Sequence, residues 1–141
     1  MATFPLKIIC PDGVKFQGEA LLLTIRTTTG EMGIQPKHIN CVAPLGMGRA
    51  IIWDENGRRT AACIGGMMSV MDGVVTLLPT TFEWADEIDV SRVDRAYDQA
   101  KAILENKQAS EAELALAEAR LKRAMVRRSV ISEKQSKTSS G

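Results

Sequence analysis

The chain has 141 residues, a formal net charge of +1, 45% hydrophobic residues and only 4% aromatic residues. This length is typical of one domain, or of one small domain with an appendage, and its core must be aliphatic. The nearly balanced charge gives no overall attraction for nucleic acid or acidic lipid.

Cysteine and histidine usage argues against two common kinds of site. Cys10, Cys41 and Cys63 stand in apolar contexts, and their odd number does not suit a secreted disulfide framework. We therefore expect reduced core thiols in a cytosolic protein. His38 is the only histidine, and no CxxC or HxxxH pair occurs, so we expect no metal site.

The sequence lacks the features of a membrane-inserted or secreted protein. No apolar run approaches the ~20 residues that a spanning helix needs. The first ten residues lack the basic start and the long apolar stretch of a signal peptide. We expect no direct membrane insertion, so a partner protein would have to hold the chain at any membrane.

The first half of the chain has the pattern of short strands separated by turns. Apolar residues alternate with others at 6–10 and 21–26, whereas 28–33 holds two glycines, which is typical of a loop. Residues 41–45 form another short apolar run.

Two hairpins follow, one over residues 51–64 with Asn56-Gly57 at its turn and one over 67–78 with Asp72-Gly73. Short strands at this spacing favour a sandwich or barrel over a βαβ fold. We predict an all-β sandwich of about ten strands over residues 1–85.

After Pro79 the pattern becomes helical, and we predict a helix–turn–helix over residues 86–131. Asp89 is a good N-cap for the first helix. Its apolar face carries Val93, Tyr97, Ala100 and Leu104.

Residues 106–109 break this helix, and Ser110 with Glu113 forms a capping box for a second one. The second apolar face carries Leu114, Ala117, Leu121, Ala124 and Met125. The short connection predicts an antiparallel hairpin. Alanine-rich faces bury little area, at roughly 25 cal/mol per Å², so we expect this hairpin to open readily. Residues 132–141 are polar, and we predict a disordered tail.

Charged residues mark a candidate binding site on the two helices. Asp89 and Arg92 lie at the start of the first helix, and Arg120, Arg123 and Arg127 share one face of the second. This arrangement suits a small phosphate-bearing ligand or an acidic protein surface. It is also the pattern of an ordinary helix cap beside a solvated charged face, and the sequence leaves both interpretations open.

The sequence gives no support for catalysis or nucleic-acid binding. It has no paired nucleophile and base and no phosphate-binding loop, so we expect no catalytic residues. Residues 120–128 hold five cations and no acid, but no aromatic residues alternate with them to stack on bases.

Two segments resemble the epsilon subunit of bacterial F-type ATP synthase. Residues 30–38, GEMGIQPKH, are similar to that family's G-E-hydrophobic-G-I-x-P-x-H loop. Residues 65–78 begin with Gly65-Gly66-Met67 and end in GVVTLL, like a second family segment. Order, spacing and length agree, and the resemblance covers about residues 4–131.

The resemblance implies a ten-stranded β-sandwich and a helical hairpin in a non-catalytic rotor subunit. The sandwich would dock on the gamma subunit and on the c-ring of a proton-translocating synthase, so that proton flow turns the central stalk. The hairpin would switch between a folded state and an extended state that blocks ATP hydrolysis. The protein would lie at the cytoplasmic face of the bacterial plasma membrane, held there by the synthase.

The resemblance also implies contact residues. The loop of residues 30–38 would dock on the c-ring through Glu31, Ile34 and His38, although its glycines and histidine also suit an ordinary turn. In its extended state the second helix would present a basic face to the catalytic alpha and beta subunits, made of Arg120, Lys122, Arg123, Arg127 and Arg128.

A regulatory ATP site is the last implication. The family motif I/L-D-x-x-R-A is matched at Ile88, Asp89 and Arg92, whereas Val93 replaces its alanine and adds bulk near the expected adenine. The complete site would consist of Glu83, Ile88, Asp89, Arg92, Arg123 and Arg127. No required cofactor is implied.

Two rival interpretations stay open at this point. One is an unrelated β-sandwich adaptor whose helical hairpin binds an acidic protein partner. The other is a free-standing nucleotide-binding protein that never meets a gamma subunit.

Overall fold

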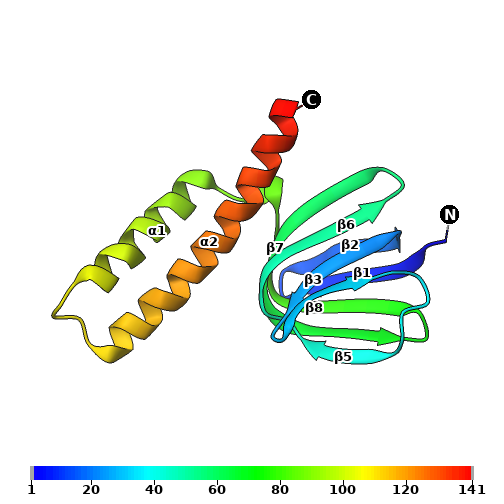
Figure 1. The fold of residues 1–141 in the computed structure, drawn as a ribbon, viewed down its shortest axis with the longest axis horizontal. Coiled ribbons are helices and arrows are strands. Elements are labelled where there is room, and N and C mark those ends of the chain that lie inside the picture. Colours follow the sequence, from blue (N-terminus) through cyan, green and yellow to red (C-terminus); the bar gives the residue numbers. More distant parts are fainter. Residues whose placement is uncertain (1, 141) are drawn as a thin grey trace. The chain divides into compact units, whose positions relative to one another are not determined.

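The computed structural model describes residues 2–140, with side chains described as far as residue 132. The chain divides into two compact units, Met1–Trp84 and Ala85–Gly141. The first is built of β-strands and the second of helices, as Figure 1 shows. The predicted fold class, a β-sandwich followed by a helical hairpin, is confirmed.

Eight strands make up the first unit. They are β1 (Phe4–Cys10), β2 (Gly13–Ala20), β3 (Leu22–Thr27), β4 (Gly30–Ile34), β5 (Cys41–Pro44), β6 (Met47–Asp54), β7 (Gly57–Met71) and β8 (Val74–Trp84). Their order is β2-β1-β8-β7-β6-β3-β4, with β5 paired to β7. Strands β1 and β8 run parallel, and the other pairs are antiparallel.

The sheet encloses one hydrophobic core, to which alternate residues of most strands contribute. The core is mostly aliphatic, as predicted, but it also contains the aromatic rings of Phe4, Phe82 and Trp84. Side chains with less than 2% of their surface exposed include Leu23 and Ile25 of β3 and Val75 and Leu77 of β8. Burial of such side chains at roughly 25 cal/mol per Å² provides the main stabilisation of this unit.

The long strand β7 explains why eight strands are present where the resemblance implied about ten. Gly65 and Gly66 bend it, with φ angles of 69° and 106°. Residues before the bend pair with β6, and residues after it pair with β5. One continuous strand therefore serves two parts of the sheet, and β8 follows it on the other side.

The predicted loop over residues 28–33 is wrong, because most of it is strand β4. The turn is confined to Thr28 and Thr29, and β4 pairs with β3 from Gly30 to Ile34. The buried hydroxyl of Thr27 donates to the Gly30 carbonyl at 2.8 Å and accepts from the Thr29 amide at 3.3 Å. These bonds close the turn early and let pairing resume.

Both predicted hairpins are confirmed, but the first turn lies at Glu55 and Asn56, between the paired residues Asp54 and Gly57, and Asn56 has no positive φ. In the first, Gly57 has a φ of 121°, and the Asp54 carboxylate accepts from the amide of Asn56 at 2.9 Å. In the second, Asp72 and Gly73 have φ angles of 51° and 82°, as a tight two-residue hairpin turn requires.

The second unit contains a short 3-10 helix η1 (Ala85–Glu87) and two α-helices, α1 (Val90–Glu105) and α2 (Glu111–Ser140). Asp89 is the N-cap of α1 and accepts from the Arg92 amide at 3.2 Å. At the start of α2, the Glu113 amide donates to the Ser110 hydroxyl at 3.1 Å and the Ser110 amide to the Glu113 carboxylate at 3.4 Å. The predicted N-cap and capping box are confirmed.

The two helices lie side by side as an antiparallel hairpin (Figure 1). Mostly small side chains are buried along them, including Val93, Ala100, Ala117 and Ala124. Met125, which we placed on the apolar face of α2, is 54% exposed. The apolar face of α2 is therefore narrower than its sequence indicates.

Helix α2 continues to Ser140, where the sequence predicted a disordered tail over residues 132–141. No glycine or proline interrupts Glu111–Ser140, so nothing in its backbone chemistry stops the helix. Gly141 lies outside the described residues. No helix in the described part of the chain has the length and apolar character needed to cross a bilayer.

An arginine-lined groove on the helical hairpin

Both helices of the hairpin contribute to one groove of about 690 Å³. Its lining consists of Arg92, Ala96, Gln99, Ala100, Ala102 and Ile103 from α1 and Arg120, Arg123 and Arg127 from α2. The groove lies entirely within the helical unit. Its wall is therefore cationic on one side and alanine-rich on the other.

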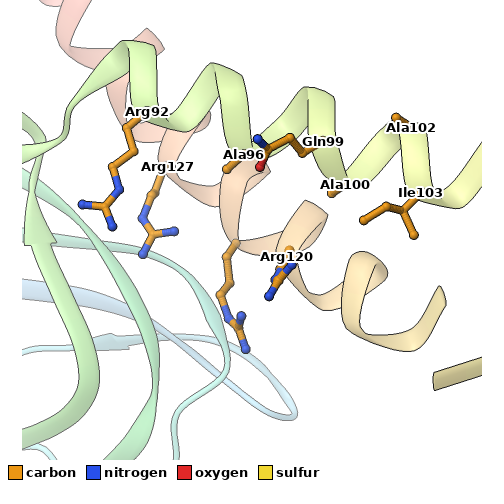
Figure 2. A pocket seen from close by; sticks show the side chains of 9 residues that line it. Arg92, Ala96, Gln99, Ala100, Ala102, Ile103, Arg120 and Arg127 are labelled. Carbon is orange, nitrogen blue, oxygen red and sulfur yellow. The ribbon is translucent and has the colours of Figure 1, made fainter. Parts of the chain in front are cut away.

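The arginines reach this groove because helical spacing places them on facing sides of the two helices. Arg120, Arg123 and Arg127 are three and four positions apart, which is one face of α2. Arg92 is on the first turn of α1. In Figure 2, Arg92 and Arg127 extend from neighbouring helices to the same side.

The charge of the groove is not neutralised by the residues that line it. No acidic side chain is among them. In the described part of the chain, no carboxylate forms an ion pair with Arg92, Arg120 or Arg123. Neighbouring guanidinium groups repel one another, and a polyanion between them would turn this repulsion into charge-assisted hydrogen bonds.

Of the six predicted ATP-site residues, the structure brings three together in this groove: Arg92, Arg123 and Arg127. Ile88 is buried just before α1, and Asp89 does not line the groove. Glu83 belongs to β8 in the other unit, opposite Ala62.

The Asp89 carboxylate is engaged in local hydrogen bonds at the start of α1. Its Oδ1 accepts from the Ser91 hydroxyl at 2.9 Å and from the Arg92 amide at 3.2 Å. The bond from Ser91, followed by that from the Arg92 amide, holds the pKa of Asp89 below its ordinary value. Asp89 is therefore ionised at neutral pH and stabilises the helix that carries Arg92.

Val93 does not obstruct the groove. Only 5% of its surface is exposed, and it is not a lining residue. The bulk that distinguishes it from the alanine of the family motif therefore lies away from the groove.

Sequence reasoning missed two polar members of this site. Arg120 was placed on one face with Arg123 and Arg127 but was left out of the six ATP-site residues, although the structure brings it into the same groove. Gln99 was not selected, yet it follows Arg92 by seven positions and so shares its face of α1.

The five cations predicted to form one basic face are divided in the closed hairpin. Arg128 pairs with Asp94 at 3.0 Å, and Lys122 lies 4.0 Å from Glu118 on its own helix. The other three cations line the groove. A single face of five is therefore not present in this conformation, because residues 122 and 128 point away from the others around the helix.

The segment predicted to dock on the c-ring contains both exposed and buried side chains. Glu31 is exposed on β4, and His38 is half-buried with its Nδ1 2.9 Å from the Ile39 carbonyl oxygen. Ile34 is fully buried in the core, so it cannot contact a partner. Ile39, which the sequence analysis did not select, is 77% exposed.

The described chain thus combines a β-sandwich with a helical hairpin that carries a cationic groove suited to binding an anion. Residues 3–85 match the family model for the ATP synthase delta/epsilon chain beta-sandwich domain, and residues 86–132 match that for its long alpha-helix domain.

Curated relatives cover nearly the whole chain. An ATP synthase epsilon chain from Exiguobacterium is 40% identical over 92% of this chain and 96% of its own length. One from Ruminococcus albus is 38% identical over 95% of this chain and 100% of its own. The chain thus belongs to the ATP synthase delta/epsilon family, among its epsilon chains, which are non-catalytic subunits of the synthase.

Solved structures agree with this assignment. A chain in the Euglena gracilis mitochondrial ATP synthase complex of OSCP, F1 and c-ring aligns with a TM-score of 0.82 and 26% identity, covering 93% of this chain and 82% of that one. A Tetrahymena thermophila chain at 15% identity and a TM-score of 0.59 shares the fold. Family membership excludes both rival interpretations, the unrelated adaptor and the free-standing nucleotide-binding protein.

Proposed function

We propose that this chain is a rotor subunit of the central stalk of a bacterial, proton-translocating ATP synthase. Its sandwich docks on the gamma subunit and the c-ring and couples ring rotation to the catalytic head. Its helical hairpin restrains ATP hydrolysis, and ATP favours the closed hairpin. The protein acts at the cytoplasmic face of the plasma membrane, where the complex holds it.

Support for the rotor role comes from the relatives and from the exposed loop of the sandwich. The Euglena neighbour belongs to a complex that contains F1 and the c-ring. In this chain, Glu31 is exposed on β4 and Ile39 is exposed in the connection between β4 and β5. Exposed segments on a sheet scaffold are where binding residues tend to lie. An exposed acid and an exposed aliphatic side chain suit contact with the polar loops of a ring.

The arginine groove is the single observation that carries the regulatory part of the proposal. Hydrogen bonds to charged groups contribute roughly 1.5–3 kcal/mol each. A millimolar Kd corresponds to about −4 kcal/mol. Two or three arginine–phosphate contacts are therefore enough for a sensor of cellular ATP.

The groove also explains how ATP would act on conformation. Its arginines come from both helices, so a triphosphate that touches Arg92 and Arg123 binds only while the helices are together. Such a ligand shifts the equilibrium toward the closed hairpin. When ATP is scarce, the hairpin opens and its cations become available to acidic surfaces of the alpha and beta subunits.

An NMR titration of the isolated, isotope-labelled chain with ATP tests this part. We expect saturable shifts on both helices with a Kd in the millimolar range or below. Arg123→Ala removes a phosphate contact and should weaken binding by at least about tenfold, or about 1.4 kcal/mol. Lys122→Ala is the matched control, because its side chain pairs with Glu118 outside the groove.

The absence of shifts up to 10 mM ATP would refute the ATP site and leave the rotor role standing. Equal weakening by Arg123→Ala and Lys122→Ala would show that net charge, and not this groove, attracts the nucleotide.

A further inference from the structure

A second cluster of side chains joins the two helices outside the groove. Nε and Nη2 of Arg128 both donate to Oδ1 of Asp94, at 3.2 and 3.0 Å. The same guanidinium lies over the ring of Tyr97, 3.7 Å from its centroid. Asp94 and Tyr97 are one turn apart on α1, so they hold Arg128 from two directions.

This cluster, which we name the Arg128 clasp, bridges residues 34 positions apart in the sequence. Elsewhere the buried side chains of the helix pair are mostly alanines, such as Ala100 and Ala124. Alanines bury little area and fix neither the rotation nor the register of a helix. A directional ion pair stacked on an aromatic ring supplies both constraints.

The clasp lies next to the groove along both helices. Asp94 follows Arg92 by two positions, and Arg128 directly follows Arg127. Because neighbouring helical residues point about 100° apart, a clasp on one side of the hairpin keeps Arg92 and Arg127 on another. Figure 2 shows these two arginines extending to the same side.

We propose that Arg128, Asp94 and Tyr97 are positioning residues that set the fraction of closed hairpin and thereby the affinity of the arginine groove. The statement about affinity depends on the function proposed above, whereas the statement about closure does not. A ligand that binds only the closed form loses affinity in proportion to the closed fraction. No clasp residue lines the groove or is needed to contact the ligand.

The clasp also gives Arg128 a different role in each state. In the closed hairpin its charge is satisfied by Asp94, and both side chains are about half exposed. Opening the hairpin separates the pair and releases a cation on α2. Arg128 then adds an unpaired positive charge to that helix, which strengthens its attraction to an acidic surface.

The effect of the clasp on hairpin closure is tested by measuring the distance between the helices in the full-length, ligand-free chain. Nitroxide labels at Asp98→Cys and Met125→Cys report this distance, because both positions are exposed and lie outside the clasp and the groove. The partly exposed Cys41 is first changed to serine so that it does not take up label. We expect one short distance in the parent chain. Asp94→Asn should add a population at longer distance.

Exchanging the two charges distinguishes a direct ion pair between residues 94 and 128 from a general loss of helix stability. Asp94→Arg with Arg128→Asp should restore most of the short-distance population that either change alone removes. Glu118→Gln is the matched control, because it removes an ion pair contained within α2. An unchanged distance in Asp94→Asn, or no recovery in the reversed pair, would overturn the clasp.

The affinity part is tested by titrating the same variants with ATP. We expect the apparent Kd of Asp94→Asn to rise by the factor by which its closed fraction falls, and saturating ATP to restore the short distance. An unchanged Kd alongside an opened hairpin would refute the link between clasp and groove. If ATP fails to bind even the parent chain, the ATP site is wrong, and the label distances alone still decide the clasp.

Discussion

Asp89 illustrates how much of this protein depends on single polar side chains. Its carboxylate caps α1 and accepts two hydrogen bonds, from the Ser91 hydroxyl and the Arg92 amide. Because these bonds favour the ionised form, the pKa of Asp89 lies below its ordinary value of 3.8. The capping interaction thus holds Arg92 at the end of the groove while leaving the guanidinium free of any carboxylate among the described residues.

Acid should weaken the start of α1 through this residue. A carboxylate whose pKa is lower in the folded chain stabilises it at neutral pH, and that contribution is lost as pH falls below 3.8 and through the folded pKa. Circular dichroism at 222 nm during an acid titration measures the loss. Asp89→Asn keeps a capping oxygen without the charge, so it should lack this component. Identical acid profiles for the two chains would contradict the assignment.

Residue-level features were predictable from the sequence where they depend on local chemistry. The Asp89 cap and the Ser110 capping box both follow from spacing alone. Ile34 was misassigned because its burial depends on tertiary structure. Strand β4 pairs with β3, where Ile34 lies opposite Leu23, and both side chains are buried in the core. Arg128 was assigned to a basic face because its partner Asp94 is on the other helix.

Among the elements, the bent strand β7 does most to shape the sandwich. Its bend at Gly65 and Gly66 lets the two halves of the strand serve β6 and β5 in turn. At Gly66 the φ of 106° suits glycine, and a Cβ would collide with the Leu78 carbonyl oxygen of β8. Backbone atoms form this obstacle, so it cannot move aside without breaking the ladder between β7 and β8.

Gly66→Ala should therefore destabilise the sandwich by roughly 2 kcal/mol or more, combining left-handed strain with a backbone collision. Gly73→Ala is the matched control, since Gly73 also has a positive φ of 82° but open space around its Cβ position. It should cost about 1 kcal/mol. Urea unfolding curves followed by tryptophan fluorescence measure both. Equal losses would show that backbone conformation alone matters at Gly66.

Elements differed in how well the sequence predicted them. Both hairpins were predicted correctly, and at Asp72-Gly73 both turn residues have the positive φ that a tight turn requires. At Asn56-Gly57 only the glycine has it, so that turn lies one residue earlier than predicted. The parallel pairing of β1 with β8 and the pairing of β5 with β7 were not predicted. They join segments far apart in the chain, which local patterning does not specify.

At the scale of the whole molecule, the chain consists of two units that are stabilised separately. Every member of the main hydrophobic core, from Phe4 to Trp84, belongs to the sandwich unit. The sandwich should therefore fold and dock without the helices. The hairpin is stabilised by small side chains, two helix caps and the Arg128 clasp, which suits the opening and closing that we propose for it.

The sequence predicted the side of the groove that the second helix forms. It placed Arg120, Arg123 and Arg127 on one face of the second helix, because 3.6-residue periodicity is local. How Arg92 meets them depends on the packing of two helices joined by a turn, and only the folded hairpin shows it.

The most direct test of the account compares ATP hydrolysis by synthase assembled with the full-length chain and with a chain ending at residue 87. We predict that both chains join the complex, and that the truncated one gives several-fold faster hydrolysis at micromolar ATP. The difference should shrink as ATP reaches millimolar concentrations and closes the hairpin. Equal rates at every ATP concentration, or a truncated chain absent from the assembled complex, would contradict it.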